Sequence, residues 1–120
     1  MQNLPKKIKR QIRELEGIAY ERQLESELRK LAAHFDAWKA NQIDPWELTE
    51  LIHKFHNGPA RELYKQYTSR FHEMNVAHAI KTGILKENEI PNEVWPHLEG
   101  PLELYRDIEE ESDRENSSEE

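Results

Sequence analysis

Glutamate and histidine residues occur in the middle of this chain at spacings that could bind a metal ion. Glu50 and His53 are three residues apart, and His56 follows His53 at the same interval. Carboxylate and imidazole groups one helical turn apart bind iron in four-helix bundles, and paired histidines can hold zinc when further ligands are supplied. A metal-binding helical protein is therefore one interpretation of the sequence.

The direction of these side chains argues against a metal site. At 100° per residue, Glu50 and His53 project from the side of a helix opposite its apolar stripe. That stripe consists of Leu48, Leu51, Ile52 and Phe55. A bundle metal site must point inward with the apolar residues. We therefore expect no metal ion or other cofactor, and Glu50, His53 and His56 remain only weak candidates.

Other catalytic patterns are missing from the sequence. The chain has no cysteine, and its four glycines do not cluster in a phosphate-binding loop. Three of the five serines, at 112, 117 and 118, lie in an acidic segment at the end of the chain. No serine, histidine and carboxylate set can be assigned from their spacing. We expect a protein that is not an enzyme.

Charge is distributed unevenly along the chain. From Glu99 onward there are ten acidic and two basic residues, whereas the preceding 98 residues hold fifteen basic and fourteen acidic ones. Five basic residues precede the first acidic one: Lys6, Lys7, Lys9, Arg10 and Arg13. Such a basic segment can contact phosphate groups or an acidic protein surface. A nucleic-acid-associated regulator is thus an alternative function, although the nearly neutral body lacks a basic footprint.

Helix start and stop signals predict a helical hairpin in the middle of the chain. Asp44 can cap a helix whose first residue is Pro45, and Asn57-Gly58 is typical of a helix end. Pro59 can then begin another helix. The sequence predicts a short helix over about 45–56 and a long helix over about 59–82, ended by Gly83 in a left-handed conformation.

A long N-terminal helix, over about 5–41, is predicted to precede the hairpin, with a break near Gly17 as the alternative. Its apolar residues form two stripes that lie about 150° apart around the axis. The second stripe, Leu24, Leu28, Leu31, Phe35 and Trp38, is expected to pack on the hairpin. The first stripe is expected to bind a protein partner, most simply a second copy in a dimer. Its residues are Ile8, Ile12, Leu15 and Ala19.

The last third of the chain reads as an irregular strap followed by an acidic tail. Prolines at 91, 96 and 101 interrupt an apolar segment, which predicts a strap with one or two short helical turns. Residues 107–120 lack apolar side chains after Ile108, so we expect a disordered tail. Residues 1–106 are then expected to form a single helical domain.

Together these features predict an all-α protein with a non-catalytic role. We expect a helical protein-protein interaction or adaptor module that self-associates. No stretch approaches the roughly 18 apolar residues that span a bilayer, and the basic N-terminus leads into no apolar segment. A soluble protein of the cytoplasm is the corresponding expectation.

Overall fold

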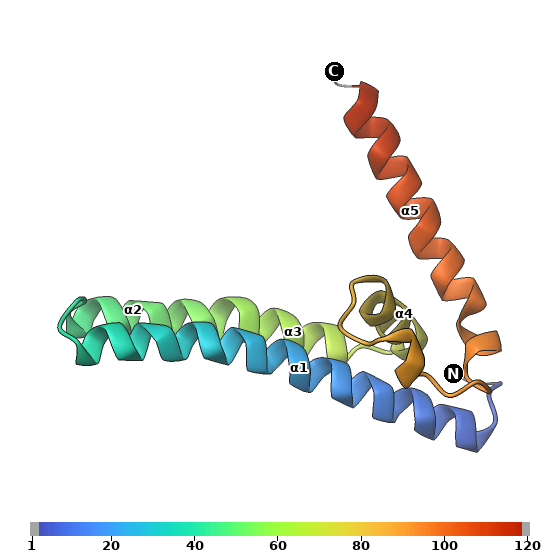
Figure 1. The fold of residues 1–120 in the computed structure, drawn as a ribbon, viewed down its shortest axis with the longest axis horizontal. Coiled ribbons are helices and arrows are strands. Elements are labelled where there is room, and N and C mark those ends of the chain that lie inside the picture. Colours follow the sequence, from blue (N-terminus) through green and yellow to red (C-terminus); the bar gives the residue numbers. More distant parts are fainter. Residues whose placement is uncertain (1–2, 119–120) are drawn as a thin grey trace. The chain divides into compact units, whose positions relative to one another are not determined.

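The computed structural model of the chain describes residues 3–118, and the side chains as far as Glu115. Within this range the fold is all-helical, as predicted (Figure 1). Its α-helices are α1 (Lys6–Lys39), α2 (Pro45–Phe55), α3 (Arg61–Tyr67), α4 (His72–Lys81) and α5 (Glu99–Ser118). Shorter helical turns are η1 (His56–Ala60), η2 (Glu87–Glu89) and η3 (Trp95–Leu98).

The helices form two compact units. One unit, here called the terminal unit, comprises Met1–Ala19 and Arg70–Glu120, and the other, the hairpin unit, comprises Tyr20–Ser69. The prediction of one domain over 1–106 did not include this division. Helix α1 contributes its first half to the terminal unit and its second half to the hairpin unit.

Helix α1 is continuous through Gly17, so the alternative of a break there does not apply. Gly17 is exposed and has no neighbouring atom within 4 Å of an added Cβ. The helix ends at Lys39, and Asn41 just beyond it has a φ of 59°. The amide of Gln42 donates to the carbonyl of Ala37 at 2.9 Å, which closes the last turn.

The second arm of the helical hairpin is continuously helical from Pro45 to Tyr67. Its start is as predicted, because the Asp44 carboxylate accepts a hydrogen bond of 2.7 Å from the amide of Glu47. The predicted stop at Asn57-Gly58 is wrong: these residues belong to the π-helical turn η1, and Gly58 does not have a positive φ. A π turn can take in Pro59, which has no amide hydrogen to donate.

The predicted long helix over 59–82 is divided into α3 and α4. The break has a local cause, because short hydroxyl side chains bond the carbonyls at the end of α3. The Thr68 hydroxyl donates to the carbonyl of Tyr64 at 2.6 Å, and the Ser69 hydroxyl donates to that of Gln66 at 2.7 Å. Phe71, which lies between the two helices, is exposed.

The terminal unit holds most of the hydrophobic core, and this overturns the predicted partner surface on α1. Its buried apolar side chains are Ile8, Ile12, Leu15, Ala19, Val76, Ala77, Ala79, Leu85, Ile90, Val94 and Leu98. The first four were expected to bind a second copy. They are instead buried within the chain, in the unit that also holds α4 and the strap that follows it, residues 82–98. Gln11 and Lys7 of α1 both bond Glu93 of the strap, at 2.9 and 3.1 Å.

The strap contains two short 3₁₀ turns, η2 and η3, as the prolines predicted. It leads into α5, which packs on α4 and η3. Residues 107–118 have helical backbone where a disordered tail was predicted, and residues 119 and 120 lie outside the described part. All side chains from 106 to 115 are exposed, so this part of α5 adds nothing to the core.

Two glycines should respond in opposite directions to substitution by alanine. Gly83 has a φ of 80°, whereas Gly58 has right-handed backbone, and neither has an atom within 4 Å of an added Cβ. We expect Gly83→Ala to lower the free energy of unfolding by about 1 kcal/mol. Gly58→Ala should raise it by about 0.5 kcal/mol, because alanine restricts the unfolded chain. Urea denaturation of the two variants tests this, and an equal change in both would contradict the assigned backbone.

Candidate interaction face of the helical hairpin

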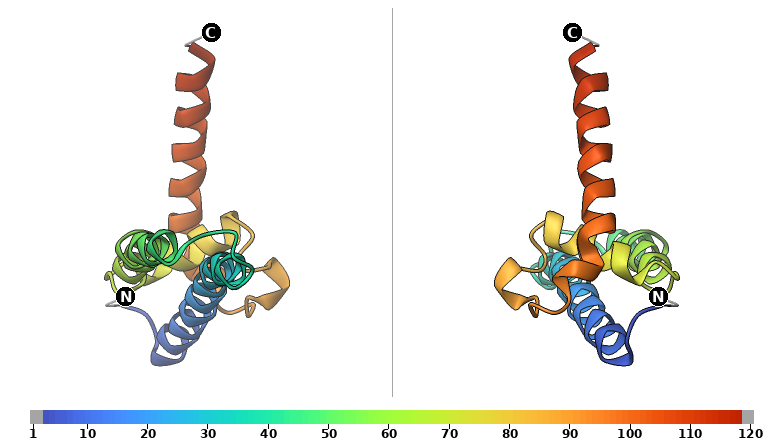
Figure 2. Two further views of the ribbon diagram at one scale, coloured as in Figure 1. Left: turned by 90° about the vertical axis from the view of Figure 1, so that its left-hand side faces the viewer. Right: turned by 90° about the vertical axis from the view of Figure 1, so that its right-hand side faces the viewer.

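The hairpin unit has a thin core. Among its described residues only Leu48, Leu63 and Tyr67 are buried apolar side chains. The Tyr67 ring stacks on Tyr20 with centroids 4.8 Å apart, and its hydroxyl donates to the side chain of Gln23. The second half of α1 runs beside α2 and α3 (Figure 1), and Figure 2 shows the hairpin end-on as two neighbouring helices. Two helices cover only one side of each other, so much apolar surface stays open.

On α1 this open surface lies on one flank. The line along which α1 contacts α2 and α3 runs through Tyr20, Glu27 and Leu31. At 100° per residue, Phe35 and Leu28 are rotated about 60° and 80° from that line. Ala32 is rotated further in the same sense, and all three line one groove beside Leu31. Leu28 is 46% exposed, so this flank of α1 presents apolar surface to solvent.

Helices α2 and α3 carry matching apolar residues. Ile52 is rotated about 50° from the contact line through Leu48 and Phe55, and Tyr64 about 80° from the line through Leu63 and Tyr67. Both rotations have the same sense as on α1. The two helical arms of the hairpin are antiparallel. Side chains that are rotated in the same sense from the contact line of each arm therefore lie on the same side of the helix pair. Ile52 and Tyr64 are 37% and 61% exposed.

We call this surface the hairpin face. It consists of Leu28, Ala32, Phe35, Ile52 and Tyr64. Leu28 and Phe35 were part of the predicted second stripe of α1, but that stripe was assigned entirely to packing inside the chain. The stripe is wider than the contact with α2 and α3 can cover, which only the burial of individual residues reveals.

The opposite side of the hairpin carries both apolar and charged side chains. A groove of about 200 Å³ there has Leu31, Leu51 and Phe55 at its base, and its edges carry charged and polar groups. These groups are Glu27, Lys30, His34 and Lys54. Lys30 bonds Glu27 at 3.0 Å across one turn of α1. Exposed apolar surface is therefore not confined to the hairpin face, since Trp46 of α2 is also 82% exposed.

The sequence-predicted metal residues do not form a site. Glu50, His53 and His56 are exposed on α2 and η1, as the helical spacing indicated. Within residues 3–118, no three histidine or carboxylate side chains are grouped closely enough to hold a metal ion.

The basic residues near the N-terminus lie on the first turns of α1. Lys7 forms an ion pair with Glu93, and Arg10 lies 3.9 Å from Glu14. The bond from Gln11 and the charge of Lys7 help to lower the pKa of Glu93 to about 2, the largest cause being the Gln11 bond. Lys6, Lys9 and Arg13 complete this group, and only Lys9 is half-buried. Neighbouring carboxylates thus offset part of the positive charge expected to contact phosphate.

Glu16 is a buried carboxylate in the terminal unit that the sequence patterns did not single out. Its two oxygens lie 2.9 and 3.0 Å from Nδ1 of His72, and one accepts a bond of 2.9 Å from the side-chain amide of Asn75. These contacts join α1 to α4 inside the core. A buried carboxylate with such partners is a structural anchor.

Removing this anchor should destabilise the protein. We expect Glu16→Ala to lower the free energy of unfolding by about 1–3 kcal/mol, because it deprives two part-buried or buried side chains of their acceptor. Glu14→Ala is the matched control on the same helix. Its carboxylate is exposed, so its loss should change stability by less than about 0.5 kcal/mol. Thermal denaturation followed by circular dichroism distinguishes the two, and equal effects would rule out an anchoring role for Glu16.

Comparisons with protein-family models, curated proteins and solved structures found no match to this chain. None of the helices described here combines the length and apolar character needed to cross a membrane. Evidence about function therefore rests on the surface of the molecule.

Proposed function

We propose that this protein is a non-catalytic interaction module that self-associates through the hairpin face. The observation that supports this most is the row of exposed apolar side chains that α1, α2 and α3 together present on one side of the hairpin. Contiguous exposed apolar surface on a protein commonly marks a site of protein-protein contact. Leu28, Ile52 and Tyr64 are the most exposed large side chains of this surface.

A second copy of the chain is the partner that this face fits best. Two hairpins packed face to face make a four-helix arrangement, in which each supplies the apolar layer that the other lacks. A two-fold pairing uses the same surface on both copies, so it needs no separate complementary site. Residues 20–69 carry seven basic and eight acidic side chains, so two hairpin units would approach each other without strong repulsion.

The mass in solution tests this proposal. Light scattering coupled to size-exclusion chromatography should give twice the 14.3 kDa chain mass at about 100 µM protein, and a lower mass on dilution. A mass of one chain throughout this range would refute self-association. The substitutions that locate the interface are described in the Discussion.

A further inference from the structure

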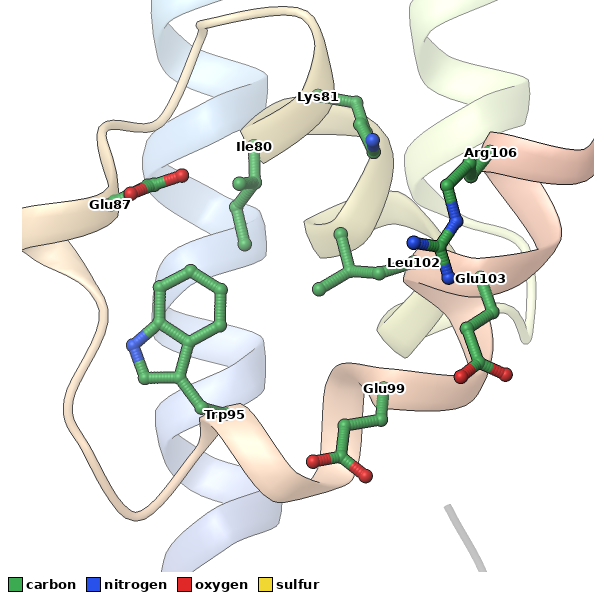
Figure 3. Close-up of a pocket in the computed structure, with 8 residues that line it drawn as sticks. All are labelled: Ile80, Lys81, Glu87, Trp95, Glu99, Leu102, Glu103 and Arg106. Carbon is green, nitrogen blue, oxygen red and sulfur yellow. The ribbon is translucent and has the colours of Figure 1, made fainter. Parts of the chain in front are cut away.

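A cavity of about 570 Å³ lies in the terminal unit between α4, the strap and the beginning of α5 (Figure 3). Pockets of about 300–1,000 Å³ are typical of sites for small molecules. The side chains that line it are Ile80, Lys81, Glu87, Trp95, Glu99, Leu102, Glu103 and Arg106. Four elements of one unit thus contribute to a cavity that plays no part in the hairpin face.

The middle of the cavity is apolar. Figure 3 shows Ile80 of α4 above the ring of Trp95, with Leu102 of α5 directed toward both. All three side chains are half-buried, so each keeps a surface open to the cavity. A tryptophan ring beside two branched aliphatic side chains can pack against an apolar group of a ligand.

Opposite charges flank this apolar middle at separate places. The ends of Lys81 and Arg106 lie on one side of Leu102, whereas Glu99 lies on the side of Trp95 and Glu87 extends from the strap (Figure 3). None of these four side chains forms an ion pair with another described residue. Glu103 adds a third carboxylate near Arg106. With three carboxylates and two cations, the cavity disfavours a purely anionic ligand.

We propose that this cavity binds a small zwitterion of the size of a short peptide. Its carboxylate pairs with Lys81 and Arg106, and its ammonium group pairs with Glu99. An apolar side chain of the ligand rests on Trp95 and Leu102. A free α-amino acid carries both charges on one carbon, whereas a dipeptide separates them by the length of a backbone unit and matches separated charges better.

Leucyl-leucine and two capped forms test this assignment. Trp38→Phe with Trp46→Phe leaves Trp95 as the only one of the three tryptophans, so that its fluorescence reports on the cavity. We expect leucyl-leucine to bind with the lowest Kd. N-acetyl-leucyl-leucine loses the ammonium charge and leucyl-leucine amide loses the carboxylate charge, so each should bind at least about fivefold more weakly. Equal Kd values, or no titration up to about 10 mM, would overturn the proposal.

Substitutions at the two ends of the cavity separate the two charge contacts. In Arg106→Gln the difference between leucyl-leucine and its amide should fall below about twofold, while the difference from the acetylated form is retained. Glu99→Gln should do the reverse. Both residues are exposed, so the fold should tolerate these changes. Arg13→Gln, on an exposed part of α1, is the control and should leave all three Kd values unchanged. Retention of both differences in Arg106→Gln and Glu99→Gln would disprove the assigned orientation.

Discussion

Leu28→Asp combined with Ile52→Asp is expected to convert the protein to a monomer while leaving its helices intact. The two carboxylates would lie in the centre of the proposed interface, on α1 and on α2. Burying an unpaired charge there is strongly unfavourable, and we expect the dimer Kd to rise at least about 100-fold. Both side chains are more than one third exposed in the single chain, so the fold itself loses little.

A matched variant controls for the added negative charge. Ala33→Asp with His53→Asp changes one exposed residue on each of the same two helices. Ala33 is five residues after Leu28, about 140° around α1, and His53 is about 100° around α2 from Ile52. This variant should remain a dimer in light scattering, and circular dichroism should show equal helicity for both variants. Dissociation of both variants to the same extent would place the interface elsewhere.

Ile12→Ala should have the largest effect on stability of any single truncation on α1. Ile12 is completely buried in the core of the terminal unit. Removing its side chain leaves a cavity in the core of the terminal unit, and we expect a loss of about 2–5 kcal/mol in the free energy of unfolding. Since small domains are stable by only about 5–15 kcal/mol, this is a large fraction of the total.

Ile18→Ala is the control for that truncation. It removes the same atoms from the same helix, but Ile18 is 39% exposed, and we expect a change below about 1 kcal/mol. Urea denaturation gives both values, and the mass of Ile12→Ala measured without urea should equal that of the unchanged protein. A monomeric, fully stable Ile12→Ala would instead restore the first stripe of α1 as an interface.

The elements that sequence reasoning predicted correctly have local causes. Asp44 determines the start of α2 by accepting a bond from a nearby amide, and Pro45 suits the first helical position. Gly83 ends α4 because glycine readily adopts the positive φ found there. The helical spacing of Glu50 and His53 likewise placed them on the outside of α2. Each of these features depends on residues within one or two helical turns.

The errors arise where the outcome depends on competing or distant interactions. Gly58 and Pro59 are common at helix boundaries, yet a π turn keeps the helix continuous through them. Thr68 ends α3 by side-chain bonds that periodicity does not register.

The assignment of partners to the two stripes of α1 failed for another reason. The helical spacing of apolar residues does not distinguish Ile12 from Leu28. Their burial differs because of a strap that lies more than 60 residues further along the chain than Ile12. The buried residues of the strap are Leu85, Ile90, Val94 and Leu98, and prolines at 91 and 96 keep them from forming one continuous helix whose stripe would indicate a partner. Their destination on the first half of α1 could therefore not be predicted. The first stripe was the one expected to lack cover, whereas the structure leaves apolar surface exposed in the hairpin unit, at Leu28.

Thiol reactivity at two adjacent positions tests the hairpin face most directly. The chain has no cysteine, so Ala32→Cys and Ala33→Cys each introduce a single thiol. Ala32 belongs to the hairpin face, and Ala33 points about 100° further around α1. We predict that the rate of labelling at position 32 falls as the protein concentration rises through the range of self-association, while the rate at position 33 stays constant. Labelling at position 32 that is independent of concentration, in a protein whose mass shows a dimer, would contradict the proposed interface.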